Sequence, residues 1–243
     1  MVEEMKYIKK KVQQQEIKHV NWAVKFKINY KLHRFLKPME CLLSNEYKHE
    51  YTSKIIEEPF VFKNLPDCKT ILDFGCNSSI LPINLASMGY DVTGIGLADY
   101  EFTHPNFTFI KDNLITHDFK GKQFDCITSV STIEHCGFPV YNQIEDGFAI
   151  ADARDKLYSL LKDGGTLIQC VPYGSGYSEE HNRSHREFLF DKQSIEWLME
   201  GFKIIKMELY GNIDTNKVMP VSDEYLMEDR YGECCIVAKK DIV

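Results

Sequence analysis

The segment Ile71-Leu-Asp-Phe-Gly-Cys-Asn-Ser-Ser79 begins as an apolar strand and then enters a tight turn. A helical stretch follows over residues 80–88, with Pro82 in its first turn and Gly89 just after its end. Gly75 lets the backbone turn and approach a ligand without a clash from a Cβ atom. The helix behind the turn offers free backbone N–H groups. This order of strand, glycine turn and helix predicts a ligand site at the end of the strand.

Short apolar strands and helical stretches alternate along the rest of the chain. Strands are predicted at residues 70–74, 91–95, 107–110, 124–130, 166–171, 202–210 and 231–238. Further helices are predicted at residues 146–162 and from Asp191, as the N-cap, to Gly201. The alternation predicts an α/β fold, a doubly wound, Rossmann-like and mostly parallel sheet of seven strands. The last two strands have no helix between them, so they are predicted to form an antiparallel C-terminal hairpin at one edge.

The two ends of the chain differ in charge. Residues 1–65 are predicted to form a basic N-terminal helical arm or lid, and residues 66–243 the main domain. Residues 41–66 look helical, with turns near Pro59 and Pro66. Residues 1–40 carry ten Lys and Arg and four Asp and Glu, whereas the rest of the chain carries 19 and 32. The acidic body argues against broad nucleic-acid binding. The arm itself has several open interpretations: a solvated helix face, a lid, a contact with the sheet or a second copy, or a surface for an anionic substrate, a membrane surface or a partner.

The composition is that of an ordinary globular protein, with 44% hydrophobic and 27% charged residues. No apolar run approaches the roughly 18 residues that a membrane helix needs, so no membrane span is predicted. The N-terminus has no apolar region typical of a secretory signal, and a cytoplasmic location is expected. The 8 cysteines include no CxxC pair, which favours buried free thiols over a disulfide framework or a zinc site.

The turn segment resembles the first motif of class I S-adenosylmethionine-dependent methyltransferases, which reads roughly (V/I)LD(V/F)GCGxG. Asp73, Gly75 and Cys76 match that motif, whereas Asn77 and Ser79 stand at its second and third glycines. Three further segments share the resemblance: Asp91-Val-Thr-Gly94, Ser131-Thr-Ile-Glu-His135 and Leu161-Lys-Asp-Gly-Gly-Thr166. The resemblance covers about residues 66–240 and implies S-adenosylmethionine as the cofactor.

The resemblance also implies which residues bind the cofactor. They are Asp73, Gly75, Cys76, Asn77, Gly96, Leu97, Asp99, Asp112, Asn113, Leu114 and Ser131. Asp112 or Asn113 is expected near the adenine amine. The family ends its second strand with an acidic residue that binds the ribose hydroxyls, but this chain has Gly96 there. Cofactor binding is therefore expected to be about 10- to 100-fold weaker, unless water or the nearby Asp99 or Glu101 compensates for the lost charge-assisted hydrogen bonds.

Candidate catalytic residues follow the fourth predicted strand. An alcohol acceptor usually needs a base within hydrogen-bond reach, and both His135 and Glu134 lie in the right region. His135 is therefore predicted to act as the general base. Positioning of a ligand and a purely structural role are the alternatives for this residue.

A second polar cluster follows the fifth predicted strand. Together with Tyr173, it is predicted to bind the acceptor through His181, Arg183, His185 and Arg186. Arginine side chains suit carboxylate or phosphate groups, so an anionic acceptor fits the cluster. The alternatives are an exposed polar loop and metal binding by His181 and His185, which are four residues apart, but no metal is predicted.

The run Ser131-Thr-Ile-Glu-His135 followed by Gly137 is similar to small-molecule methyltransferases, including ones found with sugar and surface-polysaccharide biosynthesis. The Asn/Asp-Pro-Pro-aromatic run of methyltransferases that act on nucleic-acid bases does not follow the fourth strand. The resemblance thus implies O-methylation of a small acceptor, such as a sugar or a surface-glycan precursor, by a monomer or a homodimer. Two alternatives stay open: a catalytically inactive binding or scaffold protein of the same fold, and a nicotinamide oxidoreductase.

Overall fold

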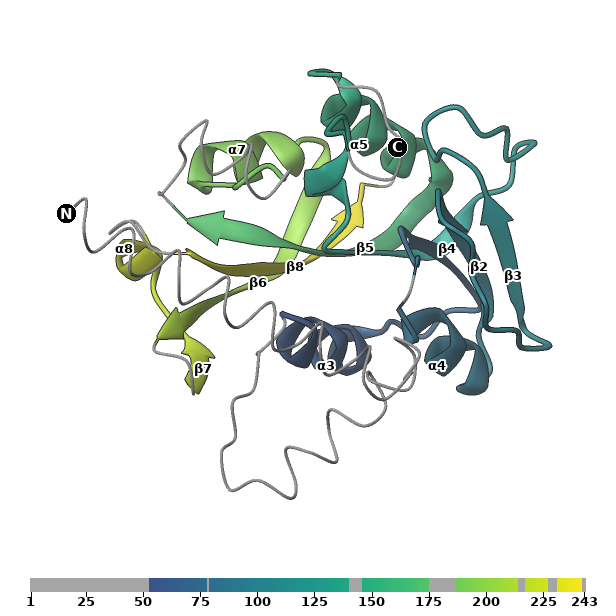
Figure 1. The fold of residues 1–243 in the computed structure, drawn as a ribbon, viewed down its shortest axis with the longest axis horizontal. Coiled ribbons are helices and arrows are strands. Elements are labelled where there is room, and N and C mark those ends of the chain that lie inside the picture. The colour runs from purple at the N-terminus through teal and green to yellow at the C-terminus, as the bar shows by residue number, and fades with distance from the viewer. Residues whose placement is uncertain are drawn as a thin grey trace, which may run out of the picture. The chain divides into compact units, whose positions relative to one another are not determined.

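The computed structural model of this protein describes residues 53–77, 79–139, 146–174, 187–213, 217–226 and 231–241. These residues form one sheet of eight strands with helices on both of its faces (Figure 1). The predictions for residues 1–52, and for the polar cluster of His181, Arg183, His185 and Arg186, lie outside the described residues.

The sheet confirms the predicted α/β class. Its strands are β1 (Thr70–Phe74), β2 (Asp91–Gly96), β3 (Phe107–Lys111), β4 (Phe124–Val130), β5 (Leu161–Gly174), β6 (Phe202–Ile213), β7 (Lys217–Pro220) and β8 (Tyr231–Lys240). Their order in the sheet is β3-β2-β1-β4-β5-β8-β6-β7. Strands β1 to β5 pair in parallel, whereas β8, β6 and β7 join the sheet antiparallel. The sheet is therefore Rossmann-like, with antiparallel C-terminal strands, as predicted.

The short strand β7 adds an eighth strand to the seven predicted. It pairs with β6 at the edge of the sheet, and helix α8 (Asp223–Leu226) follows it. A strand of four residues in a polar segment has too little periodicity to be recognised from the sequence. Strand β8 lies between β5 and β6, so β7 and not the C-terminal strand forms this edge.

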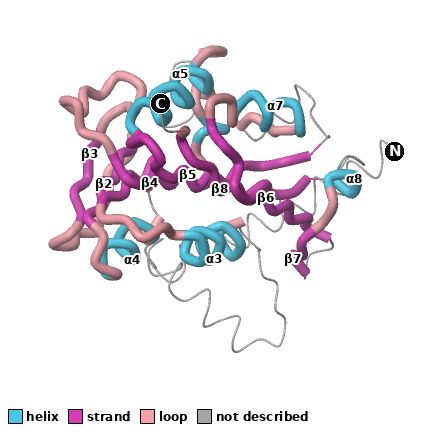
Figure 2. The backbone as a smooth tube through the Cα atoms, turned by 180° about the vertical axis from the view of Figure 1, so that it is seen from behind, coloured by secondary structure: helices cyan, strands magenta, loops and turns pink. Residues whose placement is uncertain are grey.

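Two layers of helices cover the sheet. Figure 1 shows α5 (Ala149–Leu160) and α7 (Lys192–Leu198) over one face, and α3 (Lys54–Asn64) and α4 (Leu81–Ser87) over the other; Figure 2 shows the same layers from behind. The buried apolar residues form two clusters accordingly, and neighbouring residues of β1 belong to different ones, Ile71 to the α3 side and Leu72 to the α5 side. Burial on both faces explains the continuous apolar runs of the central strands. Among the described residues, no helix is both long and apolar enough to cross a membrane.

Helix α3 packs on the sheet through Glu57, Phe60 and Val61, which are buried. The predicted turn near Pro59 is wrong, because the helix continues through this residue. A proline inside a helix removes one backbone hydrogen bond, and the burial of Phe60 and Val61 beside it offsets that loss. A separate arm over residues 1–65 stays a prediction.

Two other helix boundaries follow from local contacts. Asp191 caps α7 as predicted, because its Oδ1 accepts from the Ser194 N–H at 2.8 Å. The predicted helix at 146–162 is too long at its end, since α5 ends at Leu160 and the next residue, Leu161, already pairs with Phe124 in the sheet.

Candidate cofactor-binding and active site

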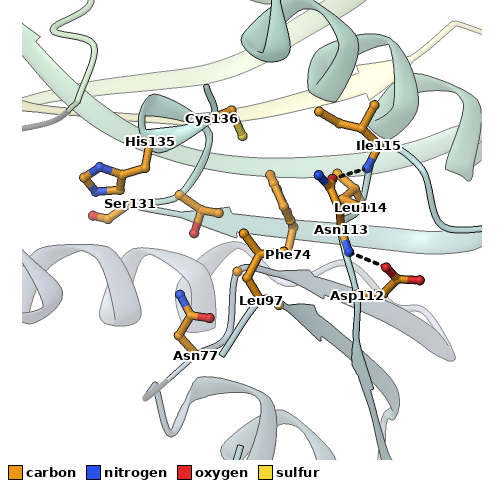
Figure 3. A pocket seen from close by; sticks show the side chains of 13 residues that line it. Phe74, Asn77, Leu97, Asp112, Asn113, Leu114, Ile115, Ser131, His135 and Cys136 are labelled. Atoms are coloured by element: carbon orange, nitrogen blue, oxygen red, sulfur yellow. Dashed lines mark hydrogen bonds between the residues drawn. The ribbon is translucent and has the colours of Figure 1, made fainter. Parts of the chain in front are cut away.

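A pocket of about 570 Å³, part of it open to solvent, lies at the carboxyl ends of β1 to β4 (Figure 3). The lining residues come from the end of each of these strands and the loop that follows: Phe74, Gly75 and Asn77 from β1; Gly96 and Leu97 from β2; Asp112, Asn113, Leu114 and Ile115 from β3; Ser131, Thr132, His135 and Cys136 from β4. Ligands of doubly wound sheets bind in this position.

The turn after β1 brings the chain close to the segment after β4. Gly75 has φ +81°, and its N–H donates to the Ile95 carbonyl oxygen at 2.8 Å. A Cβ atom at position 75 would lie 2.1 Å from Thr132 Cγ2, so a larger residue collides with the wall of the pocket. Asn77 has φ +26°, a left-handed conformation that asparagine tolerates better than most residues.

The residue at the third glycine position of the motif has a structural use. Ser79 Oγ accepts from the Leu81 N–H at 3.1 Å, at the start of α4. Its carbonyl oxygen accepts from Tyr100 Oη at 2.7 Å. Serine side chains commonly satisfy free N–H groups where a helix begins. Ser79 therefore stabilises the turn.

The end of β2 presents a glycine to the pocket where the family has an acid. A Cβ atom at Gly96 would lie 2.9 Å from Asn77 Oδ1. Asp99, a predicted substitute for the acid, has a side chain that is 86% exposed, and its Oδ1 accepts from Lys111 Nζ at 2.6 Å. The structure does not bring Asp99 to the pocket.

The loop after β3 holds its polar side chains in local hydrogen bonds. The hydrogen bond with His117, whose Nδ1 lies 2.7 Å from Asp112 Oδ2, and the bond from the Asn113 N–H lower the pKa of the Asp112 carboxyl. Asn113 Oδ1 accepts from the Ile115 N–H at 2.9 Å, as the dashed line in Figure 3 shows. Leu114 is buried and adds an apolar wall. This part of the pocket is shaped for an apolar ring with polar groups at its edge.

His135 reaches the same pocket from the 3₁₀ helix Ile133–His135, which follows β4. Its Nε2 lies 3.8 Å from Glu134 Oε1 and 3.9 Å from Glu187 Oε2, so two carboxyl groups lie near the same ring nitrogen. Glu134 is only 1% exposed, and this burial raises the pKa of its carboxyl well above the usual range. Glu187 was not predicted as a site residue, because it is distant from His135 in the sequence and lies after the predicted acceptor-binding cluster.

Helix α3 borders the segment after β4. Ser131 Oγ donates to Glu57 Oε1, and Lys54 Nζ donates to the Val130 carbonyl oxygen at 3.3 Å. Lys54 Nζ also lies 3.1 Å from Glu57 Oε2. Burial alone would lower the pKa of Lys54, but the adjacent Glu57 carboxylate raises it, so this ammonium group stays charged.

Two predicted cofactor residues lie beneath the pocket and do not line it. Asp73 is 3% exposed and its Oδ1 accepts from Thr128 Oγ1 at 2.6 Å. Burial raises the pKa of this carboxyl to about 7, against the lowering effect of the Thr128 hydrogen bond. Cys76 is also buried, and burial raises the pKa of its thiol. Asp73 therefore links β1 to β4 through Thr128, and Cys76 is an unreactive thiol.

The structure brings most predicted cofactor residues together: Gly75, Asn77, Gly96, Leu97, Asp112, Asn113, Leu114 and Ser131 line the pocket. Tyr173, predicted to bind the acceptor, belongs to the core cluster, and its hydroxyl donates to Asp223 Oδ1 at 2.5 Å. Phe74, Ile115, Thr132 and Cys136 line the pocket without having been singled out. Each of them adjoins a predicted residue, so the position of the strand ends was the signal for them. Among the described residues, no group of three or more side chains could hold a metal ion.

Comparisons with known proteins agree with this geometry. The family model described as methyltransferase domain matches residues 45–205, more than half of the chain. No curated protein sequence matches significantly. A solved S-adenosylmethionine-dependent methyltransferase from Archaeoglobus fulgidus is 16% identical, with a TM-score of 0.57 and coverage of 78% of this chain and 95% of that chain. For one from Methanosarcina mazei the identity is 17%, the TM-score 0.53 and the coverage 76% and 98%. The 1,6-didemethyltoxoflavin-N1-methyltransferase of Burkholderia thailandensis is 13% identical, with a TM-score of 0.55 and coverage of 79% and 80%.

The residues of the pocket fit the cofactor that such enzymes use. Gly75 lets the turn after β1 pack directly against Thr132, and Asn77 Oδ1 is buried without a hydrogen-bond partner among the described residues. Leu97, Leu114 and Ile115 supply apolar surface for a purine ring. With the matching family model and the shared fold, these observations lead to one conclusion: the chain belongs to the methyltransferase domain family and is a class I S-adenosylmethionine-dependent methyltransferase.

Proposed function

We propose that the protein methylates a hydroxyl oxygen of a small acceptor, a sugar or a related surface-glycan precursor. When bound, S-adenosylmethionine supplies a methyl group on a positively charged sulfur. The single observation that supports an oxygen acceptor is the position of His135, an imidazole that shares the pocket with the predicted cofactor residues Gly75 and Ser131. A hydroxyl is a poor nucleophile until a base accepts its proton, and histidine is the usual base.

The surroundings of His135 suit that role. An imidazole that accepts a proton becomes positively charged, and nearby carboxylates stabilise the charge. Glu187 Oε2 lies 3.9 Å from Nε2, within reach of a charge interaction, and the buried carboxyl group of Glu134 lies beside the ring, with Oε1 3.8 Å from Nε2. The cofactor would be held by Gly75, Asn77, Ser131 and the loop after β3. In this proposal, the ends of β1 to β3 and Ser131 bind the cofactor, and His135, in the segment after β4, accepts a proton.

The buried carboxyl group of Glu134 beside His135, and that of Glu233 near Glu134, support a polyhydroxy acceptor. Glu134 Oε2 and Glu233 Oε2 are buried and have no hydrogen-bond partner among the described residues. Burial, together with the neighbouring carboxylates of Glu57 and Glu134, raises the pKa of Glu233 well above its usual range. A protonated carboxyl both donates and accepts hydrogen bonds, as a sugar hydroxyl does. The anionic part of the predicted acceptor depends on residues 181–186 and stays a prediction.

The test is methyl transfer from labelled S-adenosylmethionine to a panel of nucleotide sugars, free sugars and matched amino sugars. The methylated product should carry the label on oxygen. His135→Ala should lower kcat by about 100- to 1,000-fold, because a general base contributes about that much. Its affinity for S-adenosylhomocysteine should stay within about twofold of wild type, since the side chain acts on the acceptor.

The matched control is His104→Ala, because His104 is not among the residues that line the pocket, and its Nδ1 accepts from the Asn106 N–H. This variant should turn over like wild type. A label on nitrogen would reject the oxygen acceptor. An unchanged kcat in His135→Ala would remove His135 from the role of base.

A further inference from the structure

We propose that the Asn77 carboxamide binds the ribose hydroxyls of the cofactor, in place of the acidic side chain that is missing at Gly96. The inference depends on the cofactor of the family and not on the proposed acceptor. It identifies one residue that determines cofactor affinity, and it explains why a glycine can end β2 in this chain.

The first argument is the space at the end of β2. An added Cβ atom at Gly96 would lie 2.9 Å from Asn77 Oδ1, 3.6 Å from Asn77 N and 3.8 Å from Asn77 Cγ. The Asn77 side chain therefore occupies the space into which a side chain at position 96 would extend. Figure 3 shows Asn77 at the same end of the pocket as Leu97, the next residue of the chain after Gly96. The side chain at position 77 thus lies where an acidic side chain at position 96 would lie.

The second argument is the backbone of Asn77. Its φ of +26° is in the left-handed region, where Asn is several-fold enriched over other residues with a Cβ atom. The turn thus accepts an amide where the family motif has glycine. If position 77 had only a structural role, glycine would be the most favourable residue there, because it has no steric penalty at this φ.

The third argument is an unmet hydrogen bond. Asn77 Oδ1 is buried and has no partner among the described residues, although Asn77 lines the pocket. Buried polar atoms are nearly always paired in folded proteins, so an unpaired one beside a ligand pocket indicates a partner on the ligand. A carboxamide offers one acceptor and two donors, and each ribose hydroxyl can pair with either kind.

The other polar side chains near this end of the pocket already have partners. Asp99 is bound to Lys111 on the surface. Asp112 accepts from the Asn113 N–H at 2.7 Å, and its second oxygen lies 2.7 Å from His117 Nδ1. Asn113 Oδ1 accepts from the Ile115 N–H. Asn77 is thus the described side chain in this region with an unused buried acceptor.

The experiment measures binding of S-adenosylhomocysteine by calorimetry, with its 2′,3′-dideoxy analogue as the probe that lacks the ribose hydroxyls. Asn77→Gly removes the carboxamide without backbone strain. It should weaken binding of S-adenosylhomocysteine about 10-fold and leave the affinity for the dideoxy analogue unchanged. Asn106→Ala, at an exposed asparagine outside the pocket, is the matched control and should bind both compounds like wild type.

A second pair of variants tests the exchange between the two positions. Gly96→Asp alone should weaken binding about 10-fold, because the new side chain meets the Asn77 amide. The double variant Asn77→Gly/Gly96→Asp should bind S-adenosylhomocysteine at least 10-fold more tightly than Gly96→Asp, because the carboxylate then reaches the hydroxyls.

Three results would overturn the inference: equal weakening of both compounds by Asn77→Gly, no weakening at all, or selective loss of S-adenosylhomocysteine binding in Asp99→Ala. Thermal unfolding of each variant identifies misfolded protein, and the double variant provides a folded alternative if Gly96→Asp fails. Because only cofactor-product binding is measured, a wrong acceptor would leave these results unchanged.

Discussion

Asp73 and Asp125 lie on the neighbouring strands β1 and β4, but at opposite ends of the sheet. At the amino end, Asp125 accepts from Thr70 N and Thr70 Oγ1, each at 2.8 Å, from Lys69 N at 3.2 Å and from Lys162 Nζ at 2.6 Å. Burial would raise the pKa of Asp125, but these donors hold it well below its usual range. At the carboxyl end, Asp73 is more deeply buried and accepts from Thr128 Oγ1, and its pKa rises to about 7.

The difference shows how one sheet serves two purposes. The amino end supplies every partner that its carboxylate needs, so the charge there stabilises the fold. At the carboxyl end, Asn77 Oδ1 and Glu134 Oε2 have no hydrogen-bond partner among the described residues. Such groups cost folding free energy, and a bound ligand can satisfy them. A binding site is therefore visible as a place where the fold leaves polar groups without partners.

The largest effect should come from replacing Gly75, at the carboxyl end of β1, with valine. Gly75 and Gly121 share a left-handed backbone, with φ +81° and +76°, but a Cβ atom at Gly75 would lie 2.1 Å from Thr132 Cγ2, whereas nothing lies within 4 Å at Gly121. Gly75→Val should weaken S-adenosylhomocysteine binding by more than about 100-fold, because strain and collision act together. Gly121→Val should lose only about 1–2 kcal/mol of stability from strain. Calorimetry measures the binding affinity, and urea unfolding measures the stability. An affinity equal to that of wild type in Gly75→Val would place the cofactor elsewhere.

A smaller effect is expected when the charge of Asp73 is removed. The folded-state pKa of about 7 is above the unfolded value, so the contribution of Asp73 to stability is complete below about pH 4 and is lost as the pH rises to 7. Asp73→Asn keeps the acceptor for Thr128 and does not ionise. Relative to wild type, the variant should therefore gain about 2–3 kcal/mol of unfolding free energy between pH 5 and pH 8. Urea unfolding at both pH values measures this, and an equal difference at the two would contradict it.

The smallest effect, with the opposite sign, is expected at Asp125. Its folded-state pKa is below the unfolded value, so its contribution is present above about pH 4 and is lost as the pH falls further. Asp125→Asn should destabilise the protein by about 1–2 kcal/mol at pH 7, because the partly exposed pair with Lys162 and the hydrogen bonds to the strand ends lose a charge. The same unfolding experiments apply. If Asp125→Asn stabilised the protein at pH 7, the proposed difference between Asp125 at the amino end of the sheet and Asp73 at the carboxyl end would be wrong.

The site could be predicted from the sequence wherever one short segment carries the signal. Gly75 and Asn77 were recognised because a strand, a turn and a helix follow one another there, and Gly96 because it ends the next strand. Parallel strands bring their carboxyl ends to one edge, so these residues meet once the fold class is known. By contrast, the ion pair between Asp99 and Lys111 depends on how the loop after β2 lies against the end of β3, and no periodicity in either segment shows it.

Hydrophobic periodicity and the glycine turn, both local properties of the chain, determined the parallel sheet, its antiparallel C-terminal strands and the family of the protein. Only the tertiary structure decided which polar groups have partners. Thr132 against Gly75, Asn77 against Gly96 and Glu187 beside His135 each join segments that are distant in the sequence or meet only across strand ends. Such contacts depend on strand pairing and loop packing at a scale of about one ångström, and patterns along the chain do not encode distances of that kind.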